Sequence, residues 1–224
     1  MSEAGNNKLQ AYADGQNMRK RQSPKRKPSK RKGLTAKIKP KKQIPQSNII
    51  EQEFISQVEE EHNVIFKPNE GPQTNFLASG EREVLYGGSA GGGKSYAMLA
   101  DPLRYMGNSN FSGLLLRHTT EELRELISKS QEMYPKIWPG IKWSERKMQW
   151  TAPSGATLWM SYLDKDQDVT KYQGLAFSWI GFDELTQWAT PFAWNYMRSR
   201  LRSADPELPL CMRATTNPGG RGHA

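Results

Sequence analysis

The chain has 224 residues and a formal net charge of +9, and 36% of its residues are hydrophobic, a low share for a fully packed globular protein. Its single cysteine, Cys211, excludes an internal disulfide and a cysteine-based zinc cluster. No segment approaches the roughly 18 apolar residues of a membrane span, and the N-terminus lacks the apolar core of a signal peptide. We therefore expect an intracellular protein without a membrane segment.

The positive charge is concentrated near the N-terminus. Thirteen of the 32 Lys and Arg residues lie between Arg19 and Lys42, a stretch without Asp or Glu, so acidic residues outnumber basic ones in the rest of the chain. Prolines interrupt this stretch, and few apolar residues accompany it. We expect residues 1–46 to form a disordered basic tail. A contact with a polyanion such as nucleic acid is the favoured role, and solubility or docking on an acidic protein surface are the alternatives.

A short amphipathic helix is expected next, within residues 47–65. Asn48 and Glu51 resemble a capping box, and apolar residues recur every four positions at Ile50, Phe54 and Val58. The apolar face would pack on the following domain or dock on a neighbouring subunit.

The pattern G-x-x-x-x-G-K-[ST], typical of a phosphate-binding loop, is present between Gly88 and Ser95. Three apolar residues before it, from Val84 to Tyr86, predict a strand, and residues 95–106 predict a helix, which is the context that this loop needs. Glycines let successive backbone N–H groups point at a phosphate, and the helix N-terminus adds partial positive charge. Lys94 would reach the β- and γ-phosphates, and Ser95 would bind Mg²⁺. The expected nucleotide contacts are Gly88, Ser89, Ala90, Gly91, Gly92, Gly93, Lys94 and Ser95.

Gln73 lies just upstream of the strand that leads into this loop. In many motor ATPases a glutamine at such a position reads the edge of adenine, because an amide can donate and accept hydrogen bonds at once. An ordinary surface glutamine is the alternative.

A second buried strand is predicted over residues 112–118, with Arg117 at the end where open α/β sheets bind ligands. Arg117 could stabilise phosphate charge or pair with an acidic neighbour. A helix should begin at Thr119 or Thr120 and run to about residue 132, with Pro135 and Pro139 ending it.

An antiparallel hairpin at the sheet edge is predicted from residues 147–151 and 156–163, which flank the turn sequence Pro-Ser-Gly. Trp150 and Trp159 are expected to be packing residues, with base stacking as the weaker alternative. Residues 164–174 are polar and predict a loop. The alternating Asp164, Asp166 and Asp168 lack the glycine and glutamate of a Ca²⁺ loop, so we expect no metal site there.

A third strand is predicted from Trp179 to Glu184, apolar at first and ending in the consecutive carboxylates Asp183 and Glu184. In a phosphate-loop ATPase the first carboxylate holds Mg²⁺, and the second can orient and deprotonate the attacking water. A solvated strand end is the alternative for an Asp-Glu pair alone. The preceding phosphate loop favours the catalytic interpretation.

A helix over residues 191–201 and a strand over residues 210–215 complete the pattern, and Thr216 and Asn217 follow the strand. These two polar residues could sense the γ-phosphate and couple hydrolysis to movement, or form a simple Asn-Pro turn. An arginine finger for a neighbouring subunit could come from the cluster Arg198, Arg200 and Arg202.

Taken together, residues 66–220 resemble the ATPase domain of the large terminase subunit, the DNA-packaging motor of tailed bacteriophages. The sequences that carry the resemblance are GPQTNFL from Gly71, YGGSAGGGKS from Tyr86, LLRHT from Leu115, YQG at Tyr172, FDE at Phe182 and ATTNPGG from Ala214. The resemblance implies a three-layer α/β phosphate-loop NTPase core with a mainly parallel sheet. It also implies that Lys94 and Ser95 bind ATP and Mg²⁺, Asp183 binds Mg²⁺, Glu184 is the catalytic carboxylate, and Thr216 and Asn217 are the coupling residues.

The family resemblance further implies an ATP-driven motor that forms a ring on the portal of the prohead and translocates double-stranded DNA inward. Its other expected partner is the small terminase subunit, and its expected location is the host cytoplasm, without retention in the mature virion. The nuclease domain of large terminases has no counterpart before Ala224, so we expect residues 66–224 to be a C-terminally incomplete ATPase domain without an assignable nuclease activity. Another helicase-like phosphate-loop ATPase, or a non-catalytic fragment that binds nucleic acid or a partner, are the alternatives.

Overall fold

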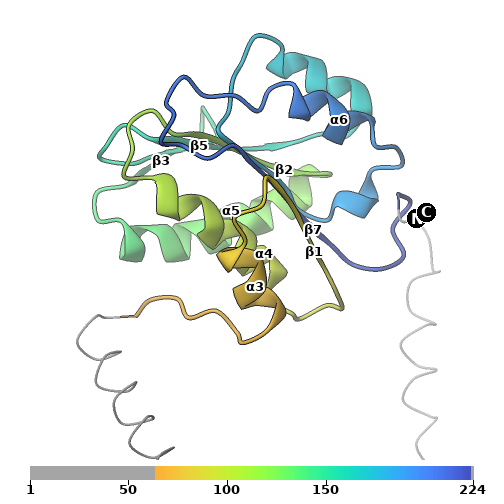
Figure 1. The fold of residues 1–224 in the computed structure, drawn as a ribbon, viewed down its shortest axis with the longest axis horizontal. Coiled ribbons are helices and arrows are strands. Elements are labelled where there is room, and N and C mark those ends of the chain that lie inside the picture. Colours follow the sequence, from red (N-terminus) through yellow and green to blue (C-terminus); the bar gives the residue numbers. More distant parts are fainter. Residues whose placement is uncertain (1–63, 223–224) are drawn as a thin grey trace, which may run out of the picture. The chain divides into compact units, whose positions relative to one another are not determined.

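The computed structural model describes residues 64–222 (Figure 1). The predicted basic tail and the predicted helix over residues 48–61 lie outside the described residues, so both stay predictions. None of the helices in the described part of the chain is long and apolar enough to cross a membrane.

Seven strands form one sheet in the order β1-β7-β6-β2-β5-β4-β3 within the described residues. They are β1 (Glu83–Gly87), β2 (Ser112–Arg117), β3 (Lys142–Ser144), β4 (Gln149–Thr151), β5 (Thr157–Tyr162), β6 (Trp179–Phe182) and β7 (Cys211–Thr216). The first five strands in this order, β1-β7-β6-β2-β5, pair in parallel. The last two, β4 and β3, pair antiparallel, β4 with β5 and β3 with β4. The predicted mainly parallel α/β sheet is confirmed, and the predicted hairpin forms its edge together with β3, which has too few residues to give a sequence pattern.

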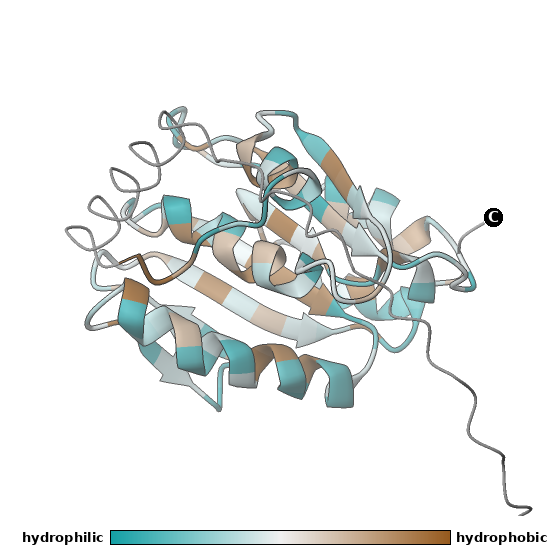
Figure 2. Cartoon of the chain, turned by 90° about the horizontal axis from the view of Figure 1, so that it is seen from below, coloured by the Kyte–Doolittle hydropathy of each residue, from teal (hydrophilic) through white to brown (hydrophobic). Residues whose placement is uncertain are grey.

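Helices cover both faces of the sheet, which makes three layers (Figure 1). One face carries α3 (Pro72–Ala78), α4 (Lys94–Ala100) and α5 (Thr120–Ile137), and the other carries α6 (Phe192–Arg198) and the 3₁₀ turn η3 (Asp166–Tyr172). Because side chains alternate along a strand, Leu115 of β2 packs beneath α4 and α5, whereas Leu114 and Leu116 face the opposite layer. Figure 2 shows hydrophobic residues along the central strands and mixed hydropathy along the covering helices.

Several predicted elements differ from the structure; the helix predicted over residues 191–201, for example, ends at Arg198, and the first hairpin strand begins at Gln149. The helix after the phosphate loop ends at Ala100 and continues as the 3₁₀ turn η2 (Asp101–Tyr105), because Pro102 has no N–H for an α-helical hydrogen bond. Pro135 does not end α5 but lies inside it, where the buried Tyr134 anchors the last turn through a 2.9 Å hydrogen bond to the Leu99 carbonyl. The predicted loop after β5 contains η3, which the buried Val169 and Tyr172 fix to the core.

The sheet order places the functional strand ends together. β7 lies between β1, which leads into the glycine-rich loop, and β6, which precedes Asp183 and Glu184. Since β1, β7, β6 and β2 are parallel, their carboxyl ends meet at one edge of the sheet, where α/β proteins bind ligands.

Candidate active site

The glycine-rich loop connects β1 to α4 and has the backbone conformation that its glycines permit. Gly91 and Gly93 have φ values of +83° and +72°, which residues with a Cβ rarely adopt. The Tyr86 hydroxyl, at the end of β1, donates a 2.6 Å hydrogen bond to the Gly92 carbonyl across the loop. The loop is therefore held by β1 beneath it and ends at the first turn of α4, whose free N–H groups favour an anion.

Lys94 and Ser95 begin α4 and line a cavity of about 330 Å³ with the glycines of the loop. The Lys94 ammonium group donates to the carbonyls of Gly88 (3.0 Å) and Ser89 (2.7 Å), so it lies folded over the loop. Glu184 and Asn217 line the same cavity from the ends of β6 and β7. The structure thus brings the predicted contacts from Ala90 to Ser95 and the predicted catalytic carboxylate to one cavity, whereas Gly88 and Ser89 do not line it.

Gln73 of α3 lies against the loop and is buried. Its amide nitrogen donates to the Gly93 carbonyl at 2.8 Å, and its oxygen accepts from the Asn69 backbone N–H at 2.6 Å. A Cβ on Gly93 would lie only 2.6 Å from this amide nitrogen, which adds a second reason for glycine there. Gln73 supports the loop through these two hydrogen bonds, so only part of its hydrogen-bonding capacity remains for an adenine ring. Its adenine-reading role stays a prediction.

Asp183 is fully buried, and its carboxylate is the meeting point of three strand ends. The Thr215 hydroxyl of β7 donates to one of its oxygens. Its other oxygen lies 3.5 Å from the Ser95 hydroxyl and 3.1 Å from Nε of Arg117 at the end of β2. The acidic-neighbour alternative for Arg117 is therefore the arrangement observed.

The residues around Asp183 fit a magnesium ion. A serine hydroxyl and a carboxylate are oxygen ligands of the type that Mg²⁺ prefers, and here they approach each other directly in front of the phosphate loop. This arrangement is the one that the phosphate-loop and strand-end motifs predict.

Glu184 has a left-handed backbone (φ +59°, ψ +53°), a conformation that is uncommon for residues other than glycine. Two groups of Asn217 hold its carboxylate: the backbone N–H donates to Oε2 at 3.0 Å, and the side-chain amide donates to Oε1 at 2.8 Å. The Glu184 N–H in turn donates to the Thr215 hydroxyl at 3.1 Å. The turn after β6 is thus fastened to the end of β7, and the strained backbone directs Glu184 into the cavity.

Thr216, the other predicted coupling residue, lies beside this turn and hydrogen-bonds with it. Its hydroxyl is 2.6 Å from the hydroxyl of Thr186, within the 3₁₀ turn η4 (Leu185–Gln187). The backbone carbonyl of Thr216 accepts from the Gly88 N–H at 3.2 Å, so the end of β7 contacts both the phosphate loop and the carboxylate turn.

Glu122 and Gln187 lie behind Glu184 and extend the hydrogen-bond network around it. Glu122, in the first turn of α5, accepts a 2.6 Å hydrogen bond from the Gln187 side chain. Burial alone would raise the pKa of Glu122, but the Gln187 hydrogen bond, the nearby Arg117 charge and hydrogen bonds from Thr119 together keep the pKa below its usual value. Glu122 is therefore ionised at neutral pH.

Sequence reasoning missed Tyr96, Lys129 and Thr215. Tyr96 and Lys129 line the cavity at the glycine-rich loop, and the Lys129 ammonium group lies 5.8 Å from the centre of the Tyr96 ring. Lys129 also pairs with Glu125 at 2.6 Å, a spacing of four residues that looks in sequence like an ordinary surface ion pair. Thr215 was counted as the last residue of a strand, and only the pairing of β7 with β6 places its hydroxyl on Asp183.

The predicted arginine cluster does not reach this cavity. Arg198 pairs with Glu83 at 2.6 Å, Arg200 lies over the Tyr196 ring, and Arg202 donates to the Leu175 carbonyl. A role of these arginines toward a neighbouring subunit stays a prediction.

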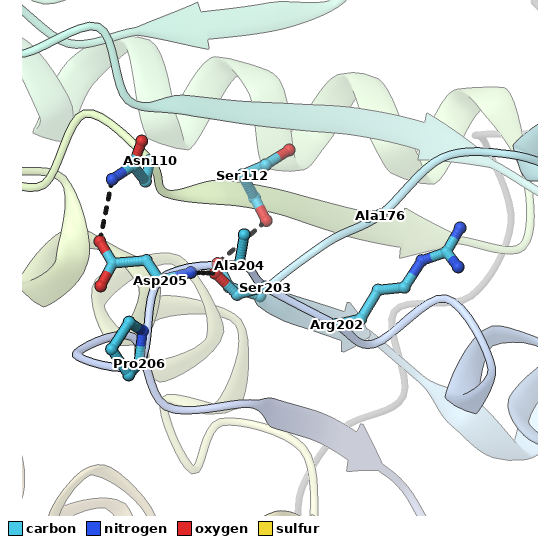
Figure 3. A pocket seen from close by; sticks show the side chains of 9 residues that line it. Asn110, Ser112, Ala176, Arg202, Ser203, Ala204, Asp205 and Pro206 are labelled. Carbon is cyan, nitrogen blue, oxygen red and sulfur yellow. Dashed lines mark hydrogen bonds between the residues drawn. The ribbon is translucent and has the colours of Figure 1, made fainter.

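A second, larger cavity of about 540 Å³ lies at the opposite edge of the sheet (Figure 3). Ser112 at the start of β2 and Ser178 before β6 line it, together with the loop that carries Asp205. The Asp205 carboxylate accepts hydrogen bonds from the side chains of Asn108 and Asn110, at 2.9 and 3.0 Å. Arg202, one of the three arginines predicted as possible fingers, lines this cavity, whereas none of the predicted nucleotide, metal or coupling residues does.

The strand order, the glycine-rich loop and the opposing carboxylates define a phosphate-loop NTPase core in which one strand separates the loop strand from the carboxylate strand. The family model "Terminase large subunit, T4likevirus-type, N-terminal" matches residues 85–220, and the chain belongs to this family. A comparison with curated proteins gave no match.

Solved structures of large terminases share the fold. The large terminase of a thermophilic bacteriophage is 17% identical over 68% of this chain, with a TM-score of 0.55. Another structure of that phage's large terminase, in complex with ATP-gamma-S, is 19% identical over 66% of this chain, with a TM-score of 0.50. The HK97 bacteriophage large terminase is 12% identical over 67% of this chain, with a TM-score of 0.52. The match spans 40%, 37% and 33% of these longer chains, respectively.

Proposed function

We propose that this chain is the ATPase part of a viral DNA-packaging terminase, which hydrolyses ATP to ADP and phosphate to drive double-stranded DNA into a prohead. The observation that carries the proposal is the position of Glu184, which faces Lys94 and Ser95 across one cavity and is held by two hydrogen bonds from Asn217. Membership of the terminase family and the ATP-gamma-S complex of a protein with the same fold support ATP as the nucleotide.

In this proposal the phosphate loop binds the triphosphate through its backbone N–H groups, from Gly88 to Ser95. Lys94 leaves the Gly88 and Ser89 carbonyls and binds the β- and γ-phosphates. Ser95 and Asp183 would hold Mg²⁺, which would neutralise negative charge on the phosphate oxygens. Tyr96 and Lys129 lie beside the loop on the side of α5, where they can contact the remainder of the nucleotide.

Glu184 is the general base. Asn217 occupies one lone pair on each carboxylate oxygen, which fixes the orientation of the carboxylate and leaves the remaining lone pairs to accept a proton from the attacking water. Because Asn217 follows β7 and Thr216 contacts both the phosphate loop and η4, a change at the γ-phosphate reaches the end of β7 directly. Thr216 and Asn217 are thus the coupling residues of the proposal.

The partners of the proposal are double-stranded DNA, the portal of the prohead, the small terminase subunit and further copies of the chain in a ring. The corresponding location is the host cytoplasm. These assignments rest on the family, and the basic stretch from Arg19 to Lys42 has the charge expected of a segment that contacts DNA.

Phosphate release by the full chain, with and without double-stranded DNA, tests the proposal. Glu184→Gln should lower turnover by about 10²–10⁴-fold while nucleotide binding persists, since the amide cannot accept the proton but keeps the shape of the side chain. Glu207→Gln, at an exposed position distant from the cavity, is the matched control. Unchanged turnover in Glu184→Gln would overturn the base assignment, and nucleotide binding without any turnover in the unaltered chain would indicate a non-catalytic fragment.

A further inference from the structure

A polar cavity of about 390 Å³ lies behind Glu184, on the side away from the phosphate loop. It shares Glu184 and Asn217 with the nucleotide cavity and is otherwise lined by Arg117, Glu122, Gln187 and neighbouring residues. Four of the eight buried side-chain polar atoms without a hydrogen bond in the described residues belong to this lining: Glu122 Oε2, Gln187 Oε1, Asn217 Oδ1 and Arg117 Nε, whose one partner is the ion pair with Asp183. Such a concentration of unpaired buried groups calls for an explanation.

Three of these four atoms are hydrogen-bond acceptors, and the fourth belongs to a cation. The amide groups of Gln187 and Asn217 already donate to Glu122 and Glu184, which leaves their oxygens directed elsewhere. The cavity thus offers a carboxylate oxygen and two amide oxygens to a group that carries several N–H donors. A guanidinium group, with five N–H donors, is the side chain that suits such a set.

Arg117 stands between this cavity and Asp183. Its Nε lies 3.1 Å from Asp183 Oδ2, and the Asp183 side chain has no solvent exposure. A buried carboxylate needs a cation nearby, because transfer of an unpaired charge out of water is costly. Arg117 supplies that cation here, at the same oxygen that faces the Ser95 hydroxyl.

A divalent cation at Ser95 and Asp183 would repel a guanidinium group at this distance, because both carry positive charge. We propose that Arg117 is a positioning residue that balances the charge of Asp183 before the metal-nucleotide complex binds. Its guanidinium group then moves away from Asp183, within the cavity that it already lines, to pair with Glu122. This inference rests on the proposed function, since it assigns a metal-nucleotide complex to the Ser95–Asp183 pair.

The proposed movement connects the metal site to two other elements. Glu122 lies in the first turn of α5, and its partner Gln187 lies in η4, directly after Glu184. An arginine that reaches Glu122 Oε2 would join β2, α5 and η4 only when the metal is present. The movement of Arg117 would therefore link metal binding at Asp183 to the turn that carries the general base, Glu184.

Binding of Mn²⁺ in the presence of saturating ADP, measured by electron paramagnetic resonance, tests this inference without turnover. In Arg117→Gln the metal no longer displaces an ion pair, so Mn²⁺ should bind on the order of tenfold tighter than to the unaltered chain. Arg104→Gln is the matched control, because Arg104 also pairs with a fully buried aspartate, Asp101, at 2.9 Å but lines neither cavity. Arg104→Gln should leave the Mn²⁺ affinity unchanged.

The destination of the arginine is tested by Glu122→Gln. This change keeps an acceptor for Gln187 but removes the negative charge that Arg117 turns toward, so Mn²⁺ should bind about three- to tenfold more weakly. In the Arg117→Gln background the same change should have no effect, because the moving cation is absent. Glu122 is only partly buried, so the single variant remains informative even if Arg117→Gln does not fold.

The outcomes separate the two claims. If the unaltered chain binds no Mn²⁺ with ADP, the proposed function itself fails. If it binds Mn²⁺ but Arg117→Gln binds with equal or lower affinity, Arg117 does not compete with the metal and the inference is wrong. An equal effect of Glu122→Gln in both backgrounds, or none in the unaltered chain, would likewise overturn the transfer of Arg117 to Glu122.

Discussion

A methyl group at position 181 should destabilise the protein, and the neighbouring side chains set the amount. Gly181 lies in the middle of β6, and an ideal Cβ there would be 2.3 Å from Cη2 of Trp179 and 2.8 Å from Sδ of Met98. Both side chains are fully buried, and the Trp179 indole is fixed by a 2.8 Å hydrogen bond to Asp101. The ring therefore cannot turn aside without losing a charge-assisted hydrogen bond.

The expected cost of Gly181→Ala is about 2–3 kcal/mol, which is the upper part of the range for overpacked cores after about 0.5 kcal/mol is recovered from the stiffer unfolded chain. For a chain of this size, that cost corresponds to a melting temperature lower by roughly 4–12 °C. Gly87→Ala in β1 is the matched control: its Cβ would meet only Thr216 at 3.7 Å, an ordinary contact, so the change should stay within about 0.5 kcal/mol.

A second variant identifies the ring as the cause. Trp179→Phe should itself cost about 3–4 kcal/mol, from the lost hydrogen bond to a buried carboxylate and a void of about 40 Å³. Phenylalanine lacks the outer ring atoms that the new methyl group would meet, and the flexible Met98 side chain can move into the space that the indole leaves. Gly181→Ala should therefore cost only about 0–1 kcal/mol in this background. Denaturant unfolding of the four proteins measures the coupling, and additive costs would refute the steric argument.

Two further predictions concern the active site and the opposite edge of the sheet. Asn217→Ala should lower the turnover number about 10- to 100-fold with little change in KM, because Glu184 keeps the backbone hydrogen bond but loses the side-chain one; steady-state phosphate release measures this, and a change confined to KM would contradict it. At Asp205, hydrogen bonds from the Asn110 and Asn108 side chains lower the pKa of the carboxyl group, so its contribution to stability is complete above the ordinary value of 3.8 and is lost as the pH falls through the lowered value. Asp205→Asn should therefore flatten the decline of unfolding free energy below about pH 4, whereas parallel pH curves for both proteins would contradict the assignment.

The residues that give the site its chemistry could be predicted from local sequence motifs. The phosphate loop depends on glycines and a lysine within eight consecutive residues, and the carboxylates Asp183 and Glu184 follow directly from an apolar strand. Such motifs survive in a single sequence because the backbone conformation that they require is local. Strands β2 and β7 were likewise predicted to within one residue at each end, and β6 begins where it was predicted but ends two residues earlier, since fully buried parallel strands give continuous apolar runs.

Elements that are very short, or that depend on packing against a distant part of the chain, could not be predicted in this way. The three residues of β3 carry no periodic pattern, and Pro135 is a helix breaker by its own chemistry. Only packing reverses these expectations: β3 is formed by pairing with β4, and the buried Tyr134 holds the last turn of α5 against α4. In both cases long-range contacts outweigh the local preference.

The sequence by itself determined which groups the protein has for binding a phosphate and a metal ion. The tertiary structure decided which residues contact these groups. The strand order β1-β7-β6-β2 brings Thr215 and Arg117 into contact with Asp183, and it brings Asn217 to Glu184, to which it donates two hydrogen bonds. These partners come from strands 30 or more residues away in sequence, so their identity depends on strand order and register. A single sequence contains no local signal for either, because any parallel order of these strands would bury the same apolar residues.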